Sequence, residues 1–228
     1  NRSLRRTRAQ GLPDPYPLTF IWRAWVQSKS PEFYQTCFFY GHPAFFSNTT
    51  RYYGAGPYPS PSPNGPLRWE IAVDGGDTVG DLVSFGRWYT CAFVCWRDGT
   101  STRHRFYYDL PDLNKRVTDD QEQSYFSSVD IDAEFCIGDA PWNHVRDGYN
   151  SKEQFKGRLR GFKIITAALS ESELLQEAAS DALVTSTALA KVWFHNPDPR
   201  PDDLRDRSGQ GHHFEWYDPR YTAALYQP

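Results

Sequence analysis

Apolar and polar residues alternate along much of this chain, and a period of two predicts β-strands. The clearest alternating segment places Trp22 and Trp25 on opposite faces of one strand. In residues 88–96 the apolar positions are nearly continuous, which indicates a central strand covered on both faces. The Asp98-Gly99 pair that follows is typical of a hairpin turn. Strands are therefore predicted in residues 18–26, 67–73, 87–96 and 105–109.

Residues 155–173 predict a strand followed directly by a short helix. Alternating apolar positions mark the strand, and Gly157 and Gly161 interrupt it as bends or close backbone approaches would. Ser170 and Glu173 form a capping box, in which each side chain can bond to the backbone of the other residue. The apolar side of the predicted helix carries Leu174, Leu175 and Ala178.

Two stretches are predicted to lie outside the sheets. Residues 54–66 are rich in proline and glycine, and because proline cannot donate to a strand ladder, we expect a long loop. Residues 109–128 are largely polar, so we expect a surface connection there. Further strands are expected in residues 33–46, with 37–40 as the apolar centre, and in residues 135–139.

The stretch 155–174 reads F-x-G-x-L-x-G-F-x-I-x-x-x-A-L-S-x-x-E-L, which resembles the closing signature of laminin-G-like, concanavalin A-like jelly rolls. The hairpin predicted in residues 87–109 resembles a second signature of the same family. The resemblance implies an all-β fold, a two-sheet antiparallel jelly-roll β-sandwich with one short helix after Ser170. It also implies an extracellular setting and a binding function, which are usual in that family.

Two C-terminal segments depart from the usual order. Residues 188–194 and 204–214 resemble the segment that normally opens such a module, yet here they follow its closing signature. Either the order is circularly permuted or a second module begins in this region. We favour permutation, because the N-terminal side lacks the opening segment and the termini of compact domains often lie close together.

The chain carries a formal net charge of −3, which does not suit a general nucleic-acid binder. Residues 1–16 are predicted to form a basic arm, and residues 17–228 a single sandwich domain. The arm suits solvent or a protein partner better than nucleic acid, because no basic groove or interleaved aromatic residues accompany it. Its basic residues are Arg2, Arg5, Arg6 and Arg8.

The cysteines show no C-x-x-C spacing that would indicate a metal site. Cys91 and Cys95 lie roughly 13 Å apart on a predicted strand, too far for a disulfide, so buried free thiols are expected. No apolar run reaches the length of roughly 18 residues that a membrane span requires, so no transmembrane helix is expected.

The sharpest catalytic candidate is an acidic row on a predicted strand. Alternation places Asp130, Asp132 and Glu134 on one face, similar to the E-x-D-x-E strand of retaining β-glucanases. Asp130 stands where that motif has Glu, and its carboxylate would fall one methylene short. We therefore favour an acidic strand edge that discourages pairing with other chains over a catalytic role.

A polysaccharide-lyase site is a second catalytic candidate, because lyase jelly rolls use a Tyr/His pair with an arginine. Alternation places Arg103, Arg105 and Tyr107 on one face of a strand and His104, Phe106 and Tyr108 on the other. The residue order matches no lyase motif, and a solvent-exposed strand face explains it equally well. Metal binding by His212 and His213 is not expected, since adjacent strand residues point apart.

The predicted binding site is the loop after residues 135–138. Sugar recognition needs an aromatic plate and planar polar groups, and this loop contains both. Asp139 and Asp147 could also supply oxygen ligands to Ca²⁺, although no dedicated loop pattern is present. The alternative is a structured loop with Trp142 folded onto the sandwich. The candidate ligand-binding residues are Asp139, Trp142, Asn143, His144, Arg146 and Tyr149.

These observations favour a non-catalytic recognition module that binds a glycan or a protein surface, in an extracellular or particle-surface setting. The alternative is a structural subunit, such as a decoration or tail component of a viral particle or cell-surface assembly, docked through the basic arm. A glycan-cleaving enzyme is the third hypothesis. The resemblance determines the fold well, but it leaves the ligand undetermined.

Overall fold

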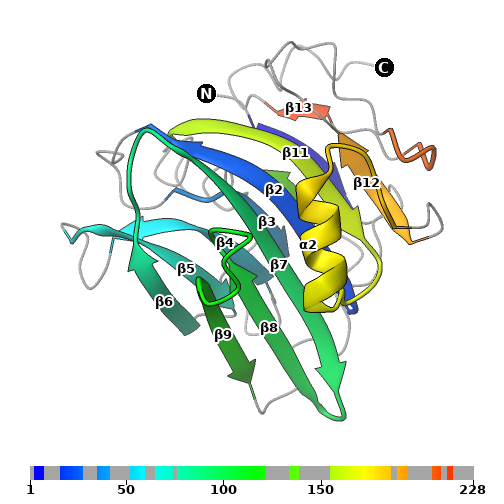
Figure 1. The fold of residues 1–228 in the computed structure, drawn as a ribbon, viewed down its shortest axis with the longest axis horizontal. Coiled ribbons are helices and arrows are strands. Elements are labelled where there is room, and N and C mark those ends of the chain that lie inside the picture. The colour runs from blue at the N-terminus through cyan, green and yellow to red at the C-terminus, as the bar shows by residue number, and fades with distance from the viewer. Residues whose placement is uncertain are drawn as a thin grey trace.

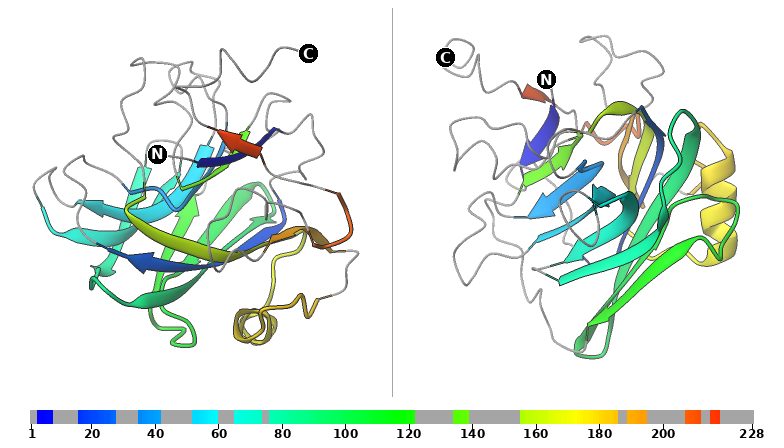
Figure 2. Two further views of the ribbon diagram at one scale, coloured as in Figure 1. Left: turned by 90° about the horizontal axis from the view of Figure 1, so that it is seen from above. Right: turned by 90° about the vertical axis from the view of Figure 1, so that its left-hand side faces the viewer.

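The computed structural model describes residues 3–7, 16–27, 35–41, 52–59, 65–73, 76–121, 134–138, 155–185, 189–194, 207–211 and 215–217. These residues form two antiparallel sheets and one short helix (Figure 1). The sheets stack face to face, and the helix lies outside one of them (Figure 2). The predicted two-sheet antiparallel jelly-roll β-sandwich is therefore confirmed.

The seven-stranded sheet has the strand order β13-β1-β10-β3-β4-β5-β6. Its strands are β13 (Glu215–Tyr217), β1 (Ser3–Thr7), β10 (Glu134–Ile137), β3 (Phe38–Gly41), β4 (Tyr52–Pro59), β5 (Leu67–Val73) and β6 (Gly76–Leu82). The six-stranded sheet has the order β12-β11-β2-β7-β8-β9. Its strands are β12 (Ala190–Phe194), β11 (Gly157–Ile165), β2 (Leu18–Val26), β7 (Trp88–Asp98), β8 (Ser101–Tyr107) and β9 (Arg116–Gln121).

The main core lies between the sheets and is largely aromatic. Trp22 stacks on Phe106 and Phe162, with ring centroids 5.7 and 5.6 Å away, and meets Phe38 edge-on at 5.1 Å. Such pairs add to the stabilisation that comes from burying their apolar area. The predicted central strand is β7, whose residues 91–95 are buried on both faces.

The helix α2 (Glu171–Ala179) covers a second, smaller core on the outer face of the six-stranded sheet. Leu174 is fully buried there against a group of sheet residues that includes Ile21, Ala92 and Val94. The predicted capping box is confirmed, because the Ser170 side chain accepts from the Glu173 N–H and the Glu173 carboxylate accepts from the Ser170 N–H. The sequence signal that predicted the helix therefore also fixes where it begins.

The prediction of a loop in residues 54–66 is wrong for residues 54–59. These residues belong to β4, which lies between β3 and β5 in the seven-stranded sheet. Gly56 permits this, because a Cβ there would lie 2.1 Å from the carbonyl oxygen of Gln35. Pro57 uses its carbonyl to accept from the Gln35 N–H at 3.0 Å. β3 pairs with residues 52–55 of β4, which precede Pro57 and Pro59. The missing N–H groups of these prolines therefore interrupt little of the β3–β4 ladder.

The surface connection predicted in residues 109–128 is also wrong in part. Residues Arg116–Gln121 form β9, which pairs with β8 at the edge of the six-stranded sheet. Val117 is buried in the core, whereas its neighbours Arg116 and Thr118 are exposed. A polar edge strand with one buried apolar residue carries too weak an alternation to be recognised in the sequence.

The two ends of the described chain meet in the seven-stranded sheet. β1 pairs with β10 on one side and with β13 on the other, so residues 3–7 form a sheet strand where we expected a basic arm. Arg5 and Arg6 lie on this strand, whereas Arg2 and Arg8 lie outside the described residues. The first C-terminal segment, residues 188–194, contains β12, which pairs with β11 in the six-stranded sheet. β13 directly follows the second segment, residues 204–214.

All four cysteines are buried thiols outside any disulfide, as expected for Cys91 and Cys95. Burial raises the pKa of the Cys37 and Cys91 thiols, which keeps them protonated and unreactive at neutral pH. Among the described residues, the only helix is far too short and polar to cross a lipid bilayer.

Candidate functional site

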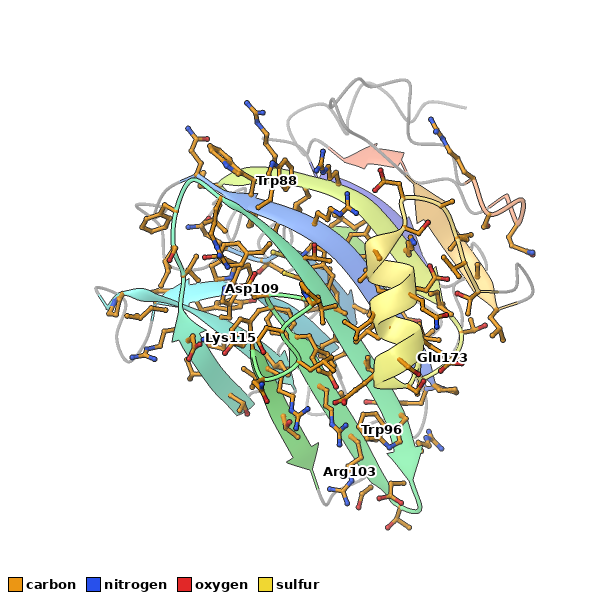
Figure 3. All side chains as sticks on the ribbon, in the orientation of Figure 1. Trp88, Trp96, Arg103, Asp109, Lys115 and Glu173 are labelled. Carbon is orange, nitrogen blue, oxygen red and sulfur yellow. The ribbon has the colours of Figure 1, made fainter. Side chains whose placement is uncertain are left out.

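The helix α2 divides the outer face of the six-stranded sheet into a covered and an uncovered region. Beneath the helix, the outward positions of β2 and β7 are the aliphatic residues Ile21, Ala92 and Val94. Where β2 ends and β7 begins, α2 does not extend over the sheet (Figure 1). Figure 3 shows Trp88 at this uncovered end and Trp96 beyond the opposite end of α2.

Two tryptophans lie side by side in the uncovered region. Trp25 on β2 is directly opposite Trp88 on β7 in the antiparallel register. Their neighbours Ala24 and Tyr89 belong to the core between the sheets, so both indoles face outward. Trp88 is 38% exposed, and Trp25 is half-buried. Directly opposed residues are neighbours on one sheet face, so both indoles belong to the same part of the outer face.

Arginines from β2 and β11 surround these tryptophans. Arg158 is opposite Trp25 in the register, and its guanidinium carbon lies 5.4 Å from the Trp25 ring centroid. Arg160 lies closer to its ring, with its guanidinium carbon 4.2 Å from the centroid of Trp88. Exposed cation–π contacts of this kind contribute about 0.5–1 kcal/mol each. We call these residues, together with Arg23, the Trp–Arg patch: Arg23, Trp25, Trp88, Arg158 and Arg160.

Two glycines of β11 make this arrangement possible, at the positions where the sequence predicted bends or close backbone approaches. A Cβ on Gly157 would lie 1.9 Å from the Trp25 carbonyl oxygen, so only glycine lets β11 approach β2 here. Gly161 has a φ of +61° and lies at a bulge between Arg160 and Lys163. A bulge inserts one residue and resets the alternation. Arg158 and Arg160 therefore face outward before it, and Lys163 again faces outward after it.

The covered region contains a buried ion pair instead. Lys163 and Glu177 are 2% and 1% exposed, and their charged atoms are 2.7 Å apart. Lys163 also donates to the carbonyls of Glu177, Ser180 and Ala182, at 2.8, 3.0 and 2.6 Å. Every donor of this ammonium group is therefore used in holding the end of α2 to the sheet. This is a structural network that leaves no donor for a ligand.

The same network sets the protonation state of Glu177. Burial alone would raise the pKa of this carboxyl, but bonds from Lys163 and from Thr185 outweigh burial and lower the pKa. Val184 N–H also donates to the carboxylate at 2.9 Å. Glu177 is therefore an ionised anchor at neutral pH, which does not suit a general acid.

A second tryptophan–arginine contact lies beyond the other end of α2. The Arg105 guanidinium carbon is 5.1 Å from the Trp96 ring centroid. Trp96 is packed against the small core under the helix, and Arg103 is 3.4 Å from Asp98 in an exposed ion pair (Figure 3). This end resembles the Trp–Arg patch in composition, but it has a single tryptophan. It therefore offers a matched control for experiments on the patch.

The residues of the lyase hypothesis do not converge on one open face. The predicted alternation on β8 is confirmed, since His104 is fully buried and Arg103 and Arg105 are half-buried. His104 Nε2 is 2.8 Å from the Tyr16 hydroxyl, on the core side. Tyr107 donates to Glu171 at 3.0 Å on the opposite side of the sheet. The predicted set is therefore divided, with His104 on the core side of the sheet and Arg103, Arg105 and Tyr107 on the outer side.

Most of the sites predicted from the sequence lie outside the described residues, and these hypotheses stay predictions. Glu134 is the first residue of β10, and nothing further is described of its side chain. The described part of the chain contains no group of three His, Cys, Asp or Glu residues that could hold a metal ion. The predicted residues outside it are Asp130, Asp132, Asp139, Trp142, Asn143, His144, Arg146, Asp147 and Tyr149.

The anchors of the predicted binding loop are described, and they lie beside β11. Gly138 precedes the loop and Phe155 follows it, and the Phe155 N–H donates to the Gly138 carbonyl at 3.0 Å. Two residues after Phe155, β11 begins, and its second residue is Arg158 of the patch. The loop therefore starts and ends next to the strand that carries the patch arginines.

Sequence comparisons find no counterpart: no family model matches the chain, and no curated protein is similar to it. Solved structures do match. A Bacteroides ovatus protein described as a candidate carbohydrate-binding protein aligns with a TM-score of 0.61 and 13% identity, over 96% of this chain and 56% of that one. A heptameric pentraxin of Limulus polyphemus aligns with a TM-score of 0.50 and 17% identity, over 78% of this chain and 75% of that one.

Tailspike protein 2 of the Escherichia coli O157:H7 bacteriophage CAB120 aligns with a TM-score of 0.52 and 10% identity, over 85% of this chain and 25% of that one. This chain thus spans about a quarter of the tailspike and just over half of the Bacteroides ovatus protein. At these identities the similarity concerns the fold. The chain has a concanavalin A-like jelly-roll fold, as the sequence motifs predicted.

Proposed function

We propose that this chain is a non-catalytic glycan-recognition module and that the Trp–Arg patch contacts the sugar. The observation that carries the proposal is the pair of opposed, outward-facing tryptophans, Trp25 and Trp88, on the uncovered part of the sheet. Sugar-binding surfaces combine aromatic side chains, which accept the apolar face of a sugar ring, with a few placed polar groups. The patch contains both kinds of group.

Elsewhere on the same sheet face, the fold covers its apolar residues with α2. Trp88 is 38% exposed beside a second indole, and Phe85, three residues before it, is 48% exposed. Clustered exposed aromatic residues on a soluble domain mark interaction surfaces more often than chance exposure. This contrast supports a binding role for Trp25 and Trp88.

The loop predicted from the sequence is proposed as the second part of the same site. Its anchors Gly138 and Phe155 lie beside the start of β11, so Trp142 and the polar residues near it belong to a segment that borders the patch in the chain. Ca²⁺ binding by Asp139 and Asp147 belongs to this proposal. We place the module at a cell exterior or particle surface, where glycans are accessible.

The description of the Bacteroides ovatus protein agrees with this proposal, although the similarity itself concerns the fold. The similarity to part of a phage tailspike agrees with the alternative, a structural subunit of a particle or surface assembly. That alternative predicts self-assembly or binding to another subunit without any glycan affinity. The two proposals therefore separate in one binding experiment.

The test is a glycan array probed with the wild-type chain, Trp88→Ala and the matched control Trp96→Ala, each with and without Ca²⁺. We expect specific glycan binding that falls at least about tenfold in Trp88→Ala, as the loss of a buried contact of about 1.4 kcal/mol gives. Trp96→Ala should bind as the wild type does, because it removes a tryptophan of β7 outside the patch.

The outcomes divide the hypotheses. A folded protein that binds no glycan would remove the glycan proposal and favour the structural subunit. Binding lost in Trp142→Ala but unchanged in Trp88→Ala would confine the site to the loop. Shortening of a bound polysaccharide during incubation would show that the module is an enzyme, and Glu134→Gln would then test the acidic row.

A further inference from the structure

Arginine side chains lie over the indole rings of the Trp–Arg patch and cover one face of each ring. The Arg160 guanidinium carbon is 4.2 Å from the Trp88 centroid, and that of Arg158 is 5.4 Å from the Trp25 centroid. A sugar that stacks on either ring from this side must first displace a guanidinium group. The identity of the ligand therefore depends on what the displaced arginine can bind next.

A neutral sugar offers the displaced guanidinium only hydroxyl groups, which replace the cation–π contact weakly. A carboxylate or sulfate offers a charge-assisted, bidentate pair, to which the planar guanidinium fork is matched. When an acidic sugar displaces the guanidinium group from the ring, the same guanidinium group can form an ion pair with the acidic group of the sugar. A neutral sugar also displaces the guanidinium group, but it offers no anion to pair with it.

The arginines of the patch are available for such a ligand. Across the part of the chain that the structure describes, neither Arg158 nor Arg160 has a carboxylate partner, and Arg160 Nε is buried without a hydrogen-bond partner. Arg23 differs, because it pairs with Asp181 at 2.8 Å. Lys163, a few residues further along β11, has all its donors in use. Arg105 beside Trp96 resembles Arg160, because its Nε is also buried without a hydrogen-bond partner. The patch differs because two arginines lie over two indoles there.

The positive charge of the patch is local, since the whole chain has a net charge of −3. Nucleic acid also combines anions with stacking rings, but tight binding there depends on many phosphate contacts along a basic surface. The patch offers two indoles and two arginines that have no carboxylate partner among the described residues, which fits one or two acidic sugar units better.

We propose that the Trp–Arg patch selects acidic glycans, with Arg158 and Arg160 moving from the indole faces to the carboxylate or sulfate oxygens of the sugar. This inference rests on the proposed function and names the ligand class of the same site. Because the arginines leave the rings on binding, tryptophan fluorescence should change with an acidic ligand. Carboxylated and sulfated sugars share this chemistry, and separate probes distinguish them.

The experiment measures affinity by calorimetry for alginate oligomers, dextran sulfate, neutral dextran and a single-stranded DNA oligomer. The proteins are the wild type, the double variant Arg158→Gln/Arg160→Gln and the control Arg103→Gln/Arg105→Gln, which removes the same charge beyond the other end of α2. We expect the wild type to bind at least one acidic polymer about tenfold or more tighter than dextran, with affinity that falls as salt rises.

In Arg158→Gln/Arg160→Gln that affinity should fall at least about tenfold, and the fluorescence change should disappear. The control variant should retain both. Equal affinity for dextran and the acidic polymers would overturn the inference and leave glycan binding intact. Binding to no carbohydrate at all would overturn the proposed function itself.

An equal loss in the control variant would show that general charge, and not the patch, attracts the polymer. DNA binding that depends on Arg158 and Arg160, without binding of acidic sugars, would replace the polysaccharide with nucleic acid as the ligand. Each of these results contradicts the acidic-glycan inference in a different way.

Discussion

The covered and uncovered regions of the six-stranded sheet use the same strands in opposite ways. Under α2, the outward residues of β2 and β7 are aliphatic, and the one charge of β11 there, Lys163, is fully paired with Glu177 and carbonyl groups. Beyond the helix, the same strands present tryptophans, and β11 presents Arg158 and Arg160 without carboxylate partners among the described residues.

This difference separates stability from binding on a single sheet face. Buried and satisfied groups stabilise the fold, and their loss leaves cavities or unpaired charges. Half-exposed groups with unused donors stabilise the fold little and remain available to a ligand. Substitutions in the covered region should therefore lower stability, whereas substitutions in the patch should lower affinity.

The largest effect is expected for Lys163→Met, which leaves the Glu177 carboxylate buried without its cation. We expect the free energy of unfolding to fall by about 3–5 kcal/mol, as measured by urea denaturation. The control Arg103→Met breaks an exposed ion pair and should cost less than about 1 kcal/mol. Equal, small losses in both variants would show that the buried pair does not anchor α2.

A somewhat smaller effect is expected for Gly157→Ala, which links the two regions because β11 passes through both. The new Cβ would lie 1.9 Å from the Trp25 carbonyl oxygen, and backbone cannot move aside cheaply. We expect a loss of about 2 kcal/mol in unfolding free energy and weaker glycan binding, because Arg158 shifts away from Trp25.

The control for this variant is Gly161→Ala, where no atom of the described residues lies within 4 Å of the added Cβ and the φ of +61° is the unfavourable feature. It should cost about 1 kcal/mol. A Gly157→Ala protein as stable as the wild type would mean that the two strands can separate without cost.

The acid side of the stability curve should depend on Glu177. Its folded pKa is lowered, so its contribution is complete above the unfolded pKa of about 4.3 and is lost as the pH falls through the folded pKa. We expect Glu177→Gln to be less stable than the wild type at pH 7 and to lose less stability between pH 5 and pH 3. A parallel acid decline in both proteins would contradict this.

The smallest effect on stability is expected for Trp88→Ala in the patch. Its indole is 38% exposed, and its Arg160 contact is a surface interaction, so thermal or urea denaturation should show a change of about 1 kcal/mol or less. The contrasting variant Trp22→Ala empties the centre of the core and should cost about 3–5 kcal/mol. A large loss of stability in Trp88→Ala would make the patch a structural element.

Elements with strong local signals could be predicted from the sequence. Alternation located β2 and β5, the Asp98-Gly99 turn located the β7–β8 hairpin, and the Ser170 capping box located α2. β4 was missed because proline and glycine usually exclude a strand, whereas here Gly56 accommodates a close backbone approach. β9 was missed because its pattern is that of a polar edge.

The Trp–Arg patch was missed because it depends on register, which alternation does not supply. The sequence placed Trp25 on the face opposite Trp22, and this was the available signal. The long-range pairing of β2 with β7 and β11 brings these residues together. It places Trp88 directly opposite Trp25 on one side and Arg158 opposite Trp25 on the other. The period shows which face a residue takes, but the strand pairing decides its neighbours.

The four buried thiols give the molecule internal reporters of its own opening. Cys37 and Cys136 lie in the seven-stranded sheet region and Cys91 and Cys95 on β7, all of them buried. A thiol reagent can reach these sulfur atoms only when the strands around them separate. The rate of labelling at each position, read by mass spectrometry, would therefore map which parts of the sandwich open first, with no engineered probe.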